Sequence, residues 1–172
     1  MVMVCLPFLL HKGGVNMLSL FAKKTMILGA PAEGDLLDIT QVSDPFFSSK
    51  NLGDGIAVNP HTELVCAPCD GKLIMLFETR HAFGIRSKDV ELLIHIGMDT
   101  VEMQGQGFTA LKKVNDPVRR GEPIIRFDRQ LLSAYDLTVM MLITKASNWH
   151  WEKHLDLQSV KASETVMTGE RL

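Results

Sequence analysis

Turn-forming residues interrupt this chain at short intervals from residue 36 onward, and this punctuation limits what the chain can fold into. Asn, Asp, Gly and Pro cluster at residues 51–55, 59–60, 70–71, 115–117 and 120–123. Gly and Asn tolerate left-handed backbone conformations and Pro fixes one backbone dihedral, so such clusters are typical of turns. The apolar runs between the clusters lie at residues 56–58, 72–77, 90–98, 124–127 and 139–144. Runs of this length, without long helices between them, predict an all-β fold, built as an antiparallel β-sandwich or barrel.

Helical periodicity is weak in this sequence. The best candidates are a short turn near residues 128–135 and a helical stretch at residues 148–157. On a helix, His150 and His154 are one turn apart and share a face. Two histidines at this spacing can chelate a metal, but a solvated helix face is the simpler interpretation.

The length and charge of the chain limit its domain organisation and its partners. Its 172 residues fit one domain, which we expect to span residues 35–172 after a flexible leader or upstream extension of residues 1–34. The formal net charge is −2, and no run of Lys or Arg occurs. Because binding to the phosphates of a nucleic acid needs a basic face, we expect no nucleic-acid partner.

The cysteines and the hydropathy of the first residues predict a cytoplasmic protein. Cys5, Cys66 and Cys69 are too few for a disulfide framework, which fits a reducing compartment. Cys66 and Cys69 lack the second pair of ligands that a structural zinc site needs, so we interpret both as small hydrophobic residues. The apolar residues 1–10 are fewer than the roughly 20 that span a bilayer as a helix, so we expect no stable membrane insertion.

A histidine stands inside the apolar run at residues 90–98. Read with the two-residue period of a strand, this run directs one face into a core, with Leu92, Ile94, Ile96 and Met98. Its other face carries Leu93, His95, Gly97 and Asp99. An extended chain over residues 77–83 likewise places Phe77, Thr79, His81 and Phe83 on one face. If the two strands pair, the imidazoles of His81 and His95 meet on an outer face, and we interpret this pair as a functional site.

Five segments occur in the order found in one known family. They are GDGIA at residues 53–57, APCDG at 67–71, ETRHAF at 78–83, LLIHIGMDTV at 92–101 and GEPIIRFD at 121–128. With these segments, residues 36–168 resemble the glucose-type IIA domains of the phosphoenolpyruvate-dependent sugar phosphotransferase system. The resemblance implies a barrel-sandwich of the duplicated hybrid motif type, with short helical turns. One difference is that Asp89 occupies the place of a usual glycine, in a loop that is one residue short.

The resemblance also implies a chemistry, because this family relays a phosphoryl group on a histidine. An imidazole suits the task, since its reference pKa of about 6.5 leaves it neutral near pH 7. The transferred group carries spread negative charge, so a second imidazole that donates an N–H stabilises it. We therefore expect His95 to be phosphorylated, His81 to stabilise the transferred group and Thr79 to orient His81. The chain has no Walker A loop and no metal-ligand pattern of an ATP-dependent kinase, and we expect no cofactor.

The implied partners are proteins. The resemblance implies the histidine phosphocarrier HPr as donor and a cysteine on the IIB domain of a sugar permease as acceptor, and it is compatible with regulatory target proteins. An apolar patch with an acidic rim would serve such encounters, because complementary charge speeds association. The residues expected to contact partners are Phe47, Phe77, Leu93, Asp44, Asp99, Gly97 and Val101.

Two other functions start from the same sequence. A zinc-dependent hydrolase would use His81 and His95, but it needs a third ligand and a base that the sequence does not nominate. The same two histidines remain candidates for adventitious or regulatory zinc. A biotinyl or lipoyl carrier needs a lysine at a hairpin tip, typically between methionines, and no such tripeptide occurs here. The phosphoryl carrier is therefore the favoured interpretation.

Overall fold

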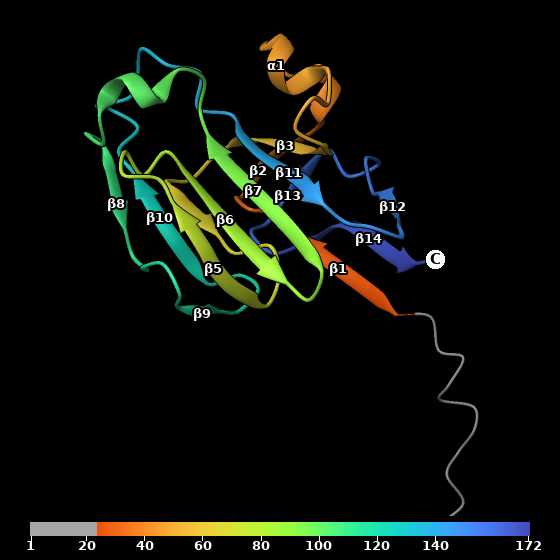
Figure 1. Ribbon diagram of the computed structural model, residues 1–172. Helices are drawn as coiled ribbons and strands as arrows, with labels where there is room; N and C mark the ends of the chain where they lie inside the picture. The colour runs from red at the N-terminus through yellow and green to blue at the C-terminus, as the bar shows by residue number, and fades with distance from the viewer. Residues whose placement is uncertain (1–23) are drawn as a thin grey trace, which may run out of the picture.

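The folded domain begins earlier than the sequence indicates. A computed structural model describes residues 24–172 (Figure 1). Its first strand, β1 (Thr25–Gly29), pairs antiparallel with its last strand, β14 (Thr165–Arg171). The domain boundary expected after residue 34 is therefore wrong, because residues 25–34 are part of the fold. The remainder of the expected leader, residues 1–23, lies outside the described residues.

Three antiparallel sheets make up the described part of the chain. The large sheet has the strand order β13-β2-β3-β11-β7-β6-β5-β9. Its strands are β13 (Ser159–Val160), β2 (Gly34–Asp38), β3 (Asp54–Pro60), β11 (Val139–Lys145), β7 (Val90–Ile96), β6 (Ala82–Ser87), β5 (Gly71–Leu76) and β9 (Pro117–Val118). The smaller sheets run β1-β14-β12 and β4-β10-β8, with β12 (Trp149–Lys153), β4 (Leu64–Cys66), β10 (Pro123–Phe127) and β8 (Phe108–Ala110). The expected antiparallel β-sandwich is confirmed, and the described strands form no closed barrel.

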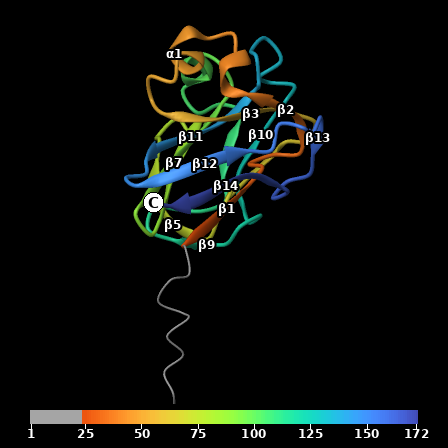
Figure 2. The same cartoon turned by 90° about the vertical axis from the view of Figure 1, so that its right-hand side faces the viewer.

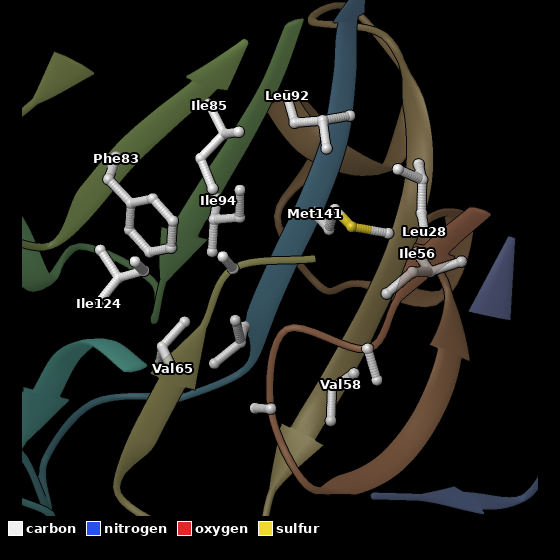
Figure 3. Close-up of a cluster of buried hydrophobic side chains, with 14 of the residues drawn as sticks. Leu28, Ile56, Val58, Val65, Phe83, Ile85, Leu92, Ile94, Ile124 and Met141 are labelled. Atoms are coloured by element: carbon white, nitrogen blue, oxygen red, sulfur yellow. The ribbon is translucent and has the colours of Figure 1, made fainter. Parts of the chain in front are cut away.

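The main hydrophobic core joins the large sheet to the two smaller ones. Figure 3 shows Phe83 and Ile94 of the large sheet gathered with Val65 and Ile124 of β4 and β10. Every second residue of β7 is buried in this core, as the sequence predicts. Burying one large apolar side chain contributes roughly 2 kcal/mol, so a strand with this alternation is strongly held in one register. The register directs His95 to the outer face.

A short helical lobe covers part of that outer face. It consists of the 3-10 helix η2 (Ile39–Gln41) and the helix α1 (Pro45–Ser48), which lies at one end of the molecule (Figure 1, Figure 2). Asp44 caps α1 by accepting a hydrogen bond from the backbone N–H of Phe46 at 2.8 Å. Lobe and sheet share a second apolar cluster, which contains Ile39, Val42, Phe47, Ala57, Met140 and Leu142. The lobe is therefore anchored to the outer face of the large sheet.

Two local expectations are wrong. Residues 149–153 form β12 rather than a helix, because backbone pairing with β14 outweighs a weak helical pattern, so His150 and His154 do not share a helix face. Met98 follows the end of β7 and packs against the second apolar cluster instead of the main core. Both errors come from contacts between segments that are distant in the sequence.

The remaining helical features are short. The 3-10 helix η3 (Thr100–Met103) follows β7 closely. The expected turn near residues 128–135 is confirmed, with a hydrogen bond of 3.1 Å from the N–H of Leu132 to the carbonyl of Asp128. Within residues 24–172, no helix has the length and apolar character needed to cross a membrane.

Candidate functional site

The hairpin of β6 and β7 positions both histidines (Figure 1). It turns through Lys88 and Asp89, with Lys88 at a φ of 54°, and it pairs Ala82 with His95. His81 directly precedes β6. The pairing therefore brings His81 and His95 to the same end of the hairpin.

The segment before His81 is a tight turn and not the extended chain expected from the sequence. The N–H of Phe77 donates to the carbonyl of Ala82 at 3.0 Å, and the N–H of Arg80 donates to the carbonyl of Phe77 at 2.8 Å. Arg80 adopts a left-handed φ of 55° to close this turn. The prediction of a strand over residues 77–81 is wrong, but the turn still delivers His81 to the face that carries His95.

The two imidazoles lie together between aromatic rings. The ring centroids of His81 and His95 are 4.9 Å apart, with an angle of 76° between the ring planes. Phe77 flanks His81 at 5.1 Å and Phe47 flanks His95 at 4.9 Å, measured between ring centroids. His81 is only 5% exposed, whereas His95 is half-buried. The apolar rings thus limit water around the pair and leave His95 the more accessible partner.

Thr79 holds the ring of His81. Its hydroxyl forms a hydrogen bond of 2.5 Å with Nδ1 of His81. The backbone carbonyl of His81 accepts a hydrogen bond from the N–H of Ile96 at 2.8 Å. A hydroxyl that donates to Nδ1 leaves the ring proton on Nε2, which then serves as a donor. The structure therefore brings together the three residues that the sequence nominates for catalysis.

Burial keeps both imidazoles neutral near pH 7. Desolvation lowers the pKa of His95 from 6.5 to about 4, and the nearby His81 adds to this shift against smaller opposing effects of the Gly97 backbone and Asp44. Desolvation also lowers the pKa of His81. Among the described residues, the buried Nδ1 of His95 has no hydrogen-bond partner. A neutral imidazole retains a lone pair, so His95 is suited to nucleophilic attack.

The lowered pKa of His95 predicts how stability responds to acid. The unfolded chain takes up this proton near pH 6.5, whereas the folded domain takes it up only near pH 4. The contribution of His95 to the free energy of unfolding is therefore complete above pH 6.5 and is lost as the pH falls toward 4. NMR titration of the His95 ring checks the pKa, and urea unfolding at pH 7 and pH 5 checks the stability. We expect His95→Gln to show a smaller loss between these pH values, and a His95 that titrates near 6.5 would contradict the prediction.

No group of three or more His, Cys, Asp or Glu side chains in residues 24–172 is arranged to hold a metal ion. Cys66 and Cys69 are buried and free of disulfides, and burial raises the pKa of the Cys69 thiol to about 12. Both thiols therefore pack as small apolar side chains.

Some of the residues expected to contact partners lie on an exposed rim. Phe77 and Val101 are 40% and 49% exposed, and Asp99 is exposed as well. Leu93 and Asp44 are half-buried. This part of the predicted partner surface is accessible in the structure.

Two other residues expected to contact partners are buried. Phe47 is only 6% exposed, and Gly97 is buried. The adjacent Phe46 is 52% exposed and is the aromatic side chain that the lobe presents to solvent. Asp44 and Pro45 mark the helix start in the sequence, but they do not tell which of the two following phenylalanines faces the sheet.

Comparison with family models identifies the family of this chain. Residues 26–149 match the model of the phosphoenolpyruvate-dependent sugar phosphotransferase system, EIIA 1. The chain belongs to this family. It is therefore a IIA component of a sugar phosphotransferase system.

Individual relatives support this family assignment. The glucose-specific EIIA component of Buchnera aphidicola is 40% identical over 152 residues, which cover 87% of this chain and 89% of the relative. The glucoside-specific EIICBA component of Staphylococcus carnosus is 40% identical over 139 residues, so this chain spans only about 20% of that longer relative. The glucose permease IIA of Mycoplasma capricolum matches in structure with a TM-score of 0.80 and 31% identity, over 86% of this chain and 97% of that chain.

The unusual residue of this IIA chain, Asp89, has a structural role. Its carboxylate forms an ion pair with Arg171 at 3.1 Å, which ties the β6–β7 turn to the C-terminal strand. The two-residue turn keeps the pairing of the hairpin, including the register of His95. The shorter loop therefore leaves the histidine pair in place.

Proposed function

We propose that this chain accepts a phosphoryl group from phospho-HPr on Nε2 of His95 and passes it to a cysteine of a IIB domain. The observation that supports this most is the contact of His81 with His95, at 4.9 Å between ring centroids, with Thr79 bound to the far side of His81. In the accepting step, the Nε2 lone pair forms a bond to phosphorus as the bond from phosphorus to the HPr histidine breaks. In the donating step, the cysteine thiolate takes the same phosphorus and the lone pair returns to His95.

His81 and Thr79 have supporting roles in this proposal. With its Nδ1 bound by the Thr79 hydroxyl, His81 keeps its ring proton on Nε2, and its ring lies 4.9 Å from that of His95 between centroids. That N–H would donate to an oxygen of the transferring phosphoryl group, where negative charge is spread over three oxygens. Because His81 is buried, this donor acts with little competition from water.

The relatives support the proposed partners and location. The EIICBA component of Staphylococcus carnosus carries its IIA part in one chain with further components, as its name states. We propose the IIB domain of a sugar permease as the acceptor, and a cytoplasmic location in which the two buried thiols stay reduced.

Phosphorylation in a purified system tests the proposal directly. The chain is incubated with labelled phosphoenolpyruvate, enzyme I and HPr, and the modified residue is mapped by mass spectrometry at neutral pH. We expect one acid-labile phosphate, located on His95, and its loss when a purified IIB domain is added. No label on this chain, or label on a hydroxyl side chain, would overturn the proposal.

Removal of zinc separates the carrier from a zinc hydrolase, which no relative supports. Transfer from pre-phosphorylated HPr should continue after treatment with a strong zinc chelator, because the imidazole nitrogens must be free to attack phosphorus. Excess zinc should inhibit transfer, since metal occupies the same lone pairs. The label on this chain is followed with time in both arms. Loss of transfer that stoichiometric zinc restores would contradict the carrier mechanism.

The exposed aromatic of the lobe should contribute to docking. Phe46→Glu should weaken binding of phospho-HPr by about 30-fold, the effect of roughly 2 kcal/mol at an interface hot spot. The thermal stability of the Phe46→Glu variant should match that of wild type, because Phe46 is 52% exposed. Concentration-dependent transfer rates measure the effect.

Two further variants act as controls for docking. Ile27→Glu places the same charge on β1, at a side chain that is 47% exposed, and should leave transfer unchanged. Phe47→Ala should instead lower thermal stability, because the ring is buried against His95. Equal transfer by the variants at Phe46 and Ile27 would show that Phe46 does not take part in docking.

A further inference from the structure

A side chain outside the histidine pair holds the turn that follows His95. The carboxylate of Asp136 accepts two hydrogen bonds from Thr138, one from its backbone N–H at 2.9 Å and one from its hydroxyl at 2.7 Å. Such an Asp-centred turn fixes the backbone between the two residues. The turn leads directly into β11, the neighbour of β7 in the large sheet.

This turn presents two backbone carbonyls to the segment after His95. The carbonyl of Thr138 accepts the N–H of Gly97 at 2.9 Å, and the carbonyl of Asp136 accepts the N–H of Met98 at 2.8 Å. Both residues follow the end of β7, where the ladder with β11 has ended at the pair of Ile96 with Val139. The Asp136 turn therefore takes over from the sheet in holding the chain.

Gly97 shows how tightly this junction is packed. It adopts a φ of +74°, which favours glycine. A Cβ at this position would lie 2.5 Å from Cγ2 of Thr100 and 2.8 Å from the carbonyl oxygen of Asp136. Thr100 is itself buried and donates its hydroxyl proton to the carbonyl of Ile96 at 2.6 Å. The backbone beside His95 is thus confined from two sides.

We infer that Asp136 is a positioning residue for His95, acting through the turn of residues 97–98. The inference rests on the proposed function. Residues 97–98 follow His95 closely in the chain, and the buried Nδ1 of His95 has no hydrogen-bond partner among the described residues, so the placement of this turn sets the position of the ring and the surroundings of its proton. When Nδ1 carries it, the lone pair lies on Nε2, where the phosphoryl group must bind. A loosened turn lets the ring shift and change tautomer, and small shifts of a nucleophile have large effects on rate.

Four variants test this role. Asp136→Ala removes both hydrogen bonds, Thr138→Val removes one, and Asp136→Asn keeps an oxygen that can accept both. Asp128→Ala is the matched control, because the Asp128 carboxylate holds a similar turn by accepting the N–H groups of Gln130 and Leu131 at 2.9 Å and 3.0 Å. Single-turnover transfer from phospho-HPr gives a maximal rate and a half-saturating concentration, and ¹⁵N NMR reports the tautomer of His95 without any phosphorylation.

For Asp136→Ala we expect a maximal rate about 10-fold below wild type, a half-saturating concentration within about twofold, and a mixed tautomer of His95. The maximal rate of Thr138→Val should lie between those of Asp136→Ala and wild type. The rates of Asp136→Asn and Asp128→Ala should match wild type. All variants are assayed below their melting temperatures. A wild-type rate and tautomer in Asp136→Ala would overturn the inference, and so would an Asn variant as impaired as the Ala variant. Failure of wild type to accept phosphate would instead reject the proposed function, and the NMR comparison would still decide the role of Asp136.

Discussion

His95→Gln should abolish phosphate acceptance, with a loss on the order of 1000-fold or more in the initial rate, as expected for removal of a nucleophile. Glutamine has a similar size and can still form hydrogen bonds, but its amide nitrogen has no free lone pair. Rapid quenching of the reaction with labelled phosphoenolpyruvate, enzyme I and HPr measures the rate.

The variant must remain folded for this result to count. Glutamine should still pack against Phe47, so the melting temperature should stay near that of wild type. Binding of HPr should also persist, because the exposed rim at Phe46 and Phe77 is untouched. Phosphate acceptance at the wild-type rate, or an acid-labile phosphate mapped to His81, would contradict the assignment of His95 as nucleophile.

His81→Gln should have the second largest effect, and mainly on donation. The variant retains the nucleophile, so phosphate should still reach His95. The N–H of His81 matters when charge redistributes on the departing phosphoryl group, and removal of one such donor costs roughly 100-fold in rate. Single-turnover transfer from the phosphorylated variant to a purified IIB domain measures this step.

Thr79 offers a matched comparison for His81. Thr79→Val removes the hydroxyl that binds Nδ1 but leaves the His81 ring in place, so donation should slow by less than in His81→Gln. If His81→Gln donates as fast as wild type, the second imidazole has no role in transfer. If it cannot accept phosphate at all, the proposed division of labour between the histidines is wrong.

The sandwich and the histidine pair were predictable because local signals dominate there. Clusters of Asn, Asp, Gly and Pro mark the turns, and the alternation of β7 shows which side of the strand is buried. With β7 placed, the histidine pair also requires the segment that carries His81 to lie beside this strand. The ordered family motifs predicted that neighbour, although the chain reaches His81 through a tight turn and not through a strand.

The wrong expectations concern segments that are determined by distant partners. β1 forms because it pairs with β14, which lies at the other end of the sequence, and the residues near position 25 give no local signal of this pairing. Likewise, β12 is a strand because it pairs with β14, where Trp151 packs over Gly169 so closely that a Cβ there would lie 2.7 Å from the ring. The same holds for Phe47, whose burial depends on the sheet beneath the lobe.

The pairing of β1 with β14 also determines how this domain can be tethered. Thr25 lies opposite Glu170, so the two ends of the folded domain leave it at neighbouring points, away from the lobe that flanks His95 (Figure 1, Figure 2). A linker at either end therefore leaves the face that carries His81 and His95 open. In a chain that fuses this domain to another, a short flexible linker raises the effective concentration of the neighbouring domain to the millimolar range. The same geometry leaves this face accessible to a domain of another protein.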